Sequence, residues 1–167
     1  MTPAPARNDK ALAGLRIAVG VLFLIFAEYK VFGTTFTLGG GFQGWIHRFV
    51  DEGAAYPFMV PMLKGFVLAH GTAIAFLVAY SELAIGVALT LGILTRVASV
   101  GGFVYMLTLL VSSNYPGPHA PAWEYFGASL DHLVLALCFA TFIASDPDRV
   151  LSVRARRTAS TGGETSA

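Results

Sequence analysis

The stretch "LRIAVGVLFLIFAEYKVFG", residues 15–33, decides the fold class of this chain. After Arg16 its apolar run continues without a break as far as Glu28 and Lys30. The whole stretch of residues 15–33 is close in length to the roughly 20 mostly apolar residues that a helix needs to cross a membrane. A charged side chain near the middle of the hydrocarbon costs roughly 3 kcal/mol or more, so something must compensate these charges.

The composition points the same way. Of the 167 residues, 55% are hydrophobic and only 13% are charged, whereas about 25% of the residues in a soluble domain are charged. The eleven lysines and arginines form no basic face, so no nucleic acid is expected as a partner. The single cysteine, Cys138, excludes an internal disulfide and a CxxC redox pair.

Four windows are long and apolar enough to be spans: 12–33, 65–94, 97–115 and 125–144. We therefore predict an all-α integral membrane protein, a four-helix transmembrane bundle over residues 12–153. Residues 1–11 form a cytoplasmic segment in this interpretation. Residues 154–167 form a disordered cytoplasmic tail, because their composition is small and polar.

The basic residues predict the orientation. Lysine and arginine are enriched in cytoplasmic loops, and here eight lie on one side: Arg7, Lys10, Arg16, Arg96, Arg149, Arg154, Arg156 and Arg157. Only Lys30, Arg48 and Lys64 lie on the other side. Both termini are therefore predicted to be cytoplasmic, in the inner membrane of a bacterium or archaeon.

The first loop on the outer side carries an amphipathic pattern. Apolar residues recur at helical spacing, with polar residues between them: Phe42, Trp45, Ile46, Phe49 and Val50. This pattern predicts a short helix that lies in the outer membrane interface.

Ionisable residues from three spans fall at one depth. At ~1.5 Å per residue, Glu28, His70, Asp131 and His132 all lie about 8 to 10 Å inside the outer end of their spans. We expect them to converge on one polar pocket. Lys30 follows Glu28 by two residues, about 200° around the helix, and is expected to extend to the outer headgroups.

Glu82 lies deeper, near the middle of the second span. It belongs to a stripe of small residues that lets another helix approach closely: Gly71, Ala75, Ala79 and Gly86. Its carboxyl could hold the bundle together or take part in function, and the sequence leaves both interpretations open. His70 and His132 could ligate a haem, but without further ligand spacing they predict no metal site.

At these residues the sequence resembles the DoxX/DoxD family of small four-helix membrane proteins, over residues 12–153. The resemblance rests on the opening stretch, on "SELAIGVALTLGILTRVAS" (81–99) and on "LDHLVLALCFATFIASDPDRVLS" (130–152). It departs from the family at Glu28, where relatives often have a small or polar residue. The proline-rich loop before Asp131 is similar to the thiosulfate:quinone oxidoreductase branch.

That branch implies a membrane subunit that passes electrons from a sulfur compound to quinone, and other relatives imply assembly with soluble redox proteins. Glu82 and Arg96 match as motif positions, and Asp131 matches through the loop. We expect Glu82 and Asp131 to be catalytic, and Glu28, His70, His132 and Arg96 to bind ligand.

Two functions follow from these residues. The first is a quinone-linked oxidoreductase subunit in the lipid bilayer, which needs a redox partner protein or a haem because the chain has no cysteine pair to carry electrons. The second is a non-enzymatic assembly partner or small-molecule carrier, in which the polar residues hold a bundle or a homo-oligomer together.

Overall fold

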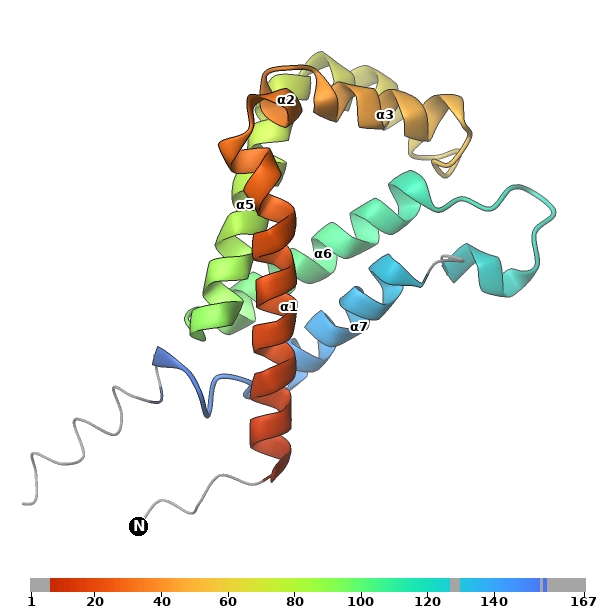
Figure 1. The fold of residues 1–167 in the computed structure, drawn as a ribbon. Helices are drawn as coiled ribbons and strands as arrows, with labels where there is room; N and C mark the ends of the chain where they lie inside the picture. The colour runs from red at the N-terminus through yellow and green to blue at the C-terminus, as the bar shows by residue number, and fades with distance from the viewer. Residues whose placement is uncertain (1–6, 127–129, 154, 156–167) are drawn as a thin grey trace, which may run out of the picture.

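The computed structural model describes residues 7–126, 130–153 and 155, and all regular secondary structure in them is helical (Figure 1). The predicted segment 1–11 is described only from residue 7, and the predicted tail lies outside the described residues except for residue 155. The elements are α1 (Arg7–Phe32), α2 (Thr34–Thr37), α3 (Gly41–Asp51), α4 (Val60–Met62), the π-helical turn η1 (Leu63–Val67), α5 (Gly71–Leu91), α6 (Thr95–Ser113), the 3-10 turn η2 (Ala122–Phe126) and α7 (Asp131–Ala144).

Three of these helices, α1, α5 and α6, are long and apolar enough to cross a membrane. The second predicted span is shortened because its first residues belong to the π-helical turn η1, and the backbone leaves the helical conformation at His70 before α5 begins. The fourth predicted span is also shorter than expected. Residues 122–126 form a separate 3-10 turn, so α7 has only 14 residues.

The long helices pack as two pairs, α1 along α5 and α6 along α7 (Figure 1). We call the end with the α5–α6 turn the hairpin end and the opposite end the α3 end. The pairs meet toward the hairpin end, where the rings of Phe23 and Phe139 contact edge to face with centroids 5.4 Å apart. Gly102 makes room for this contact, since a Cβ there would lie 2.3 Å from the Phe139 ring.

Six of the seven buried residues of α1, all except Val19, follow a heptad-like spacing along one seam: Ala13, Arg16, Gly20, Phe23, Ala27 and Lys30. The facing seam of α5 contains the predicted small-residue stripe, and every member of that stripe is buried. Leu24 of α1 rests on Gly86, where a Cβ would come within 2.8 Å of its side chain. The predicted close approach of two helices along this stripe is therefore confirmed.

A second core lies at the α3 end. It joins α2, α3, η1 and α5 through buried residues that include Phe36, Phe42, Ile46 and Val67. The predicted helix in the first loop exists as α3, but Phe42 and Ile46 on its apolar face are buried against protein. A spacing pattern identifies an apolar face without saying whether lipid or protein covers it.

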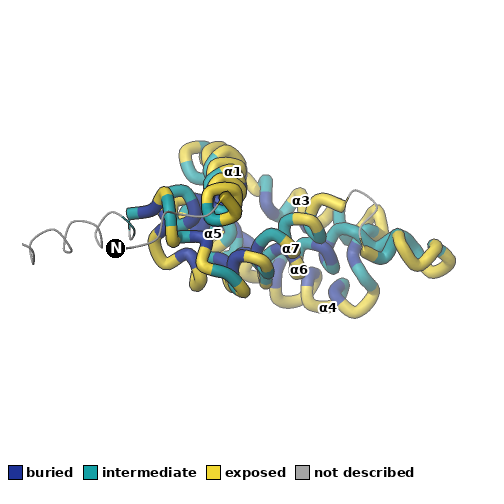
Figure 2. Tube along the Cα trace, turned by 90° about the horizontal axis from the view of Figure 1, so that it is seen from below, coloured by how far each residue is buried: buried dark blue, intermediate teal, exposed yellow. Residues whose placement is uncertain are grey.

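The outward faces of the helices are apolar. Figure 2 shows buried residues between the helices and exposed residues on their outer sides. The exposed apolar side chains include Ile25, Phe32, Leu77, Val97 and Leu137. Such a surface needs an apolar solvent, so the chain is a membrane protein that contacts the lipid bilayer.

Arg16, one of the eight basic residues counted on the cytoplasmic side, is not exposed to solvent. Its side chain is fully buried and donates hydrogen bonds to the carbonyl oxygens of Leu89 and Leu151, both at 2.7 Å. The last carbonyls of a helix lack partners within that helix, so Arg16 satisfies the end of α5. It also ties the segment after α7 to α1.

Candidate functional site

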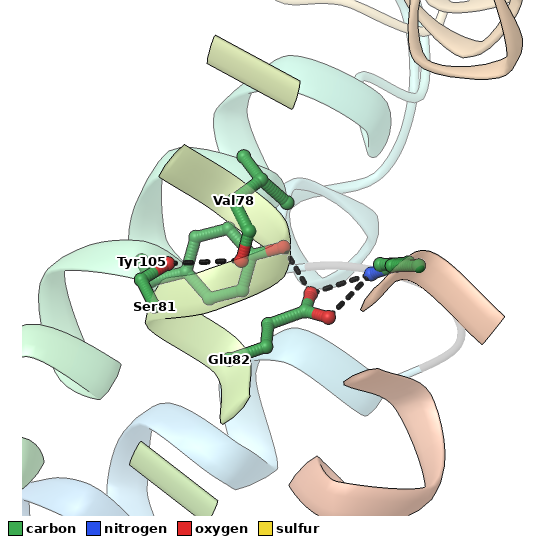
Figure 3. Close-up of polar contacts among 5 residues, drawn as sticks. Val78, Ser81, Glu82 and Tyr105 are labelled. Atoms are coloured by element: carbon green, nitrogen blue, oxygen red, sulfur yellow. Dashed lines mark hydrogen bonds and ion pairs between the residues drawn. The ribbon is translucent and has the colours of Figure 1, made fainter. Parts of the chain in front are cut away.

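A buried ion pair links α1 to α5. Lys30 Nζ donates to both carboxylate oxygens of Glu82, at 2.6 Å each, and the Tyr105 hydroxyl of α6 donates to Glu82 Oε1. Figure 3 shows Glu82 between these donors, with the neighbouring Ser81 hydroxyl bonded back to the Val78 carbonyl at 3.0 Å. The side chains of Lys30 and Glu82 are only 11% and 5% exposed. Three helices therefore meet at one carboxylate inside the membrane.

The position of Lys30 contradicts the expectation that it reaches the headgroups. It lies in the last turn of α1, where the helix dipole favours a cation, and on the seam that faces α5. The Tyr29 and Phe36 rings lie near the ammonium, with centroids 5.6 and 5.2 Å from Nζ. That expectation considered only Glu28, on the same helix, as a partner for Lys30. The partner in the structure is Glu82, 52 residues away in the sequence.

Lys30, Glu82 and Tyr105, the polar cluster of this site, line a cavity of about 400 Å³. Most of the remaining wall is aromatic or aliphatic, with side chains from α1, α2, α3, α4, η1, α5, α6 and α7. Binding sites for small molecules typically have volumes of about 300–1,000 Å³ and apolar walls with a few placed polar groups. The cavity matches this description.

The first residues of α7 bring further polar groups to the same cavity. Asp131 and His132 both line it, and their side chains are 54% and 20% exposed. His132 Nδ1 lies 2.8 Å from Asn114 Oδ1 and 3.3 Å from Asp131 Oδ1. Because a carboxylate only accepts hydrogen bonds, this arrangement favours a proton on Nδ1 and leaves Nε2 as the acceptor.

The structure brings Asp131 and His132 to the cavity wall and places Glu28 and His70 away from it. Glu28 is exposed and lies outside the cavity wall. Lys30 faces inward, so a residue about 200° away on the helix faces outward. His70 is also exposed, and its Nδ1 lies 2.9 Å from the Phe66 carbonyl of its own segment. The sequence places these residues at one depth along their helices, but it does not give the direction in which each side chain points.

Arg96 is exposed at the start of α6, near the hairpin end, and lies outside the cavity wall. Sequence reasoning left Tyr105 outside the candidate site, because a tyrosine in a membrane helix can equally be a packing aromatic or a hydrogen-bond donor. The heptad-like seam of α1 would have revealed that both Lys30 and Arg16 point into the protein.

The residues present do not fit a haem held by His70 and His132, because only His132 lines the cavity. Within the described residues, no group of three or more His, Cys, Asp or Glu side chains could hold a metal ion. A quinone headgroup fits better, because it is a flat, largely apolar ring that needs hydrogen-bond donors at its oxygens.

Comparison with known proteins gives one match. No curated protein and no solved structure matches the chain. The family model of DoxX matches residues 11–114, well over half of the chain. This match includes Lys30, Glu82 and Tyr105 and ends before Asp131 and His132. The chain therefore belongs to the DoxX family.

Proposed function

We propose that this chain is the membrane subunit of a quinone-linked oxidoreductase complex, and that its cavity binds the quinone headgroup. The observation that carries this proposal is the buried cluster of Lys30, Glu82 and Tyr105 on the wall of an apolar cavity of about 400 Å³. The resemblance to the thiosulfate:quinone oxidoreductase branch supports a sulfur compound as the electron source.

The cluster has hydrogen-bonding capacity to spare. An ammonium has three N–H donors, and Lys30 uses two of them on Glu82. The third can be donated to a carbonyl oxygen of the headgroup. A carboxylate has about four acceptor sites, and three at Glu82 are occupied. The remaining site can accept a hydrogen bond from a hydroxyl of the reduced headgroup. A bound quinone would supply the two-electron chemistry, and Tyr105 would hold the carboxylate in place.

His132 can exchange a proton with the same cavity through Nε2, beside the half-exposed Asp131. We propose these two residues as the route by which protons reach the headgroup as the quinone is reduced. Electron transfer requires a redox partner protein, because the chain offers one cysteine and no cysteine pair.

We also propose four spans, with α3 on the outer side and both termini cytoplasmic. At ~1.5 Å per residue α7 covers about 21 Å, so it needs a locally thinned bilayer to complete a crossing. Cysteines introduced at Gly117 and Ser166 in a Cys138→Ala background test this orientation. The cysteine at position 117 should react with an impermeant maleimide from outside sealed cells. Labelling of the cysteine at position 166 from that side would overturn the topology.

The binding test compares two carboxylates. In lipid nanodiscs, Glu82→Gln should still insert, at a cost in stability because Lys30 loses its carboxylate partner, and should lose about tenfold or more in affinity for a quinone, the effect of one charge-assisted hydrogen bond. Glu28→Gln is the matched control, because Glu28 is exposed and lies outside the cavity wall, and its affinity should be unchanged. Unchanged binding in Glu82→Gln would remove this carboxylate from the site.

One observation favours the second function, a non-enzymatic assembly partner or carrier. Lys30 and Glu82 already satisfy each other, as a purely structural pair would. A purified protein that carries no lipophilic molecule and binds no quinone, with or without the Glu82→Gln substitution, would support that function. The apolar surface would then hold the partner protein or a second copy of the chain.

A further inference from the structure

We infer that the cavity opens sideways into the bilayer between α1 and α7, and that it takes the head of a membrane-soluble amphiphile whose tail remains in the lipid. The identity of the head as a quinone rests on the proposed function. The route into the cavity rests on the geometry alone.

The α1 side of the opening consists of aromatic residues that both line the cavity and are exposed. Phe26 and Tyr29 are 56% and 52% exposed, whereas Phe23 on the same wall is 4% exposed. A residue can line a cavity and remain half exposed only at its rim. Phe26 lies six residues before the end of α1, about 9 Å along the helix, within a candidate membrane span. This rim therefore faces lipid.

The other side of the opening belongs to α7, which contributes Asp131, His132 and Leu135 to the wall. α1 and α7 touch at Phe23 and Phe139, and α7 leans away from α1 toward the α3 end (Figure 1). Beyond this contact, residues of both helices line the cavity and are exposed. We name this edge of the cavity the α1/α7 mouth, with Phe26, Tyr29 and Asp131 on its rim.

The size and polarity of the cavity select the kind of ligand. About 400 Å³ is at the low end of the usual ~300–1,000 Å³, enough for a substituted ring and the first carbons of a tail. A long prenyl or alkyl chain must therefore pass out through the mouth. The polar cluster lies on the buried side and the aromatic rim on the exposed side, which matches an amphiphile that enters head first.

A photoreactive lipid tests this route without any quinone. The protein is reconstituted into lipid vesicles with a long-chain alkylphenol that carries a diazirine on its ring, and the crosslinked residues are located by mass spectrometry. Met106 lines the cavity and is 3% exposed, and it should be labelled. Leu89 is 0% exposed and lies outside the cavity wall, and it should stay unlabelled. Labelling confined to exposed residues such as Ile25 would overturn the inference.

A blocked mouth supplies the matched control. In a Cys138→Ala background, Phe26→Cys is purified, folded and then conjugated with a bulky maleimide, which should reduce labelling of Met106 to background. The same conjugate on Ile25→Cys should change nothing, because Ile25 is 58% exposed but does not line the cavity. If Met106 is still labelled behind the conjugate at position 26, the lipid enters by another route and the inference fails. If Met106 is labelled through this mouth but no quinone binds, the proposed function fails and the lateral opening stands.

Discussion

Lys30→Met tests the central claim that a charge pair is buried in the membrane. The substitution keeps an unbranched side chain of similar length and removes the ammonium. Glu82, whose side chain is 5% exposed, then keeps only the hydrogen bond from Tyr105. Two charge-assisted hydrogen bonds of 2.6 Å are lost. The variant therefore leaves an uncompensated carboxylate on the seam between α1 and α5.

The expected magnitude separates a charge pair from an ordinary contact. Removing one partner of a buried ion pair costs about 3–5 kcal/mol, whereas hydrogen bonds between membrane helices average about 0.6 kcal/mol and reach about 1.7. We expect Lys30→Met to lower the free energy of unfolding by about 3–5 kcal/mol at neutral pH.

The assay is steric trapping in bicelles, which gives the free energy of unfolding in a lipid environment. The double variant Lys30→Met/Glu82→Leu should lie within about 1 kcal/mol of the parent, since apolar replacements of buried ion pairs are often neutral. Lys64→Met removes an exposed lysine and should change the stability by about 0.5 kcal/mol or less. The buried pair would be refuted if Lys30→Met lowered the free energy of unfolding by less than about 0.6 kcal/mol and if this effect simply added to that of Glu82→Leu in the double variant.

Two further predictions concern packing and the buried arginine. Gly102→Ala places a methyl group 2.3 Å from the Phe139 ring and should lower the free energy of unfolding by about 1–3 kcal/mol through overpacking. The control Gly101→Ala points into open space and should be neutral or stabilising in thermal unfolding. Equal effects of the two variants would contradict this packing. Arg16→Met leaves two carbonyls without their donor and should lower the melting temperature, with each lost bond to a charged group worth about 1.5–3 kcal/mol. Arg7→Met removes an exposed arginine and should have little effect. A similarly small shift for both variants would contradict the structural role of Arg16.

Much of the helical architecture could be predicted from the sequence. The windows 12–33 and 97–115 correspond within a few residues to α1 and α6, because a run of apolar residues specifies a membrane helix almost regardless of its neighbours. The window 65–94 was less accurate at its start, where hydropathy cannot distinguish the π-helical turn at Leu63–Val67 from an α-helix.

The candidate site was harder to predict, because it depends on how each helix is rotated about its axis. Depth can be counted along a chain, and it placed Glu28 and His70 near His132. The direction of a side chain depends on how the helices pack, and in the structure Glu28 and His70 face outward whereas Lys30 faces inward. Glu82 was recognised because small residues marked its face, and Lys30 was missed because its seam on α1 was not followed.

The ion pair also has a consequence for how the protein is made. α1 leaves the ribosome and enters the membrane before the chain has reached Glu82, 52 residues beyond Lys30. During that interval the lysine has no carboxylate partner. Because it lies two residues from the end of α1, its ammonium can wait among the headgroups at little cost. The arrival of α5 then draws it inward, so we expect the final depth of the first helix to be set only after the second long helix has been inserted.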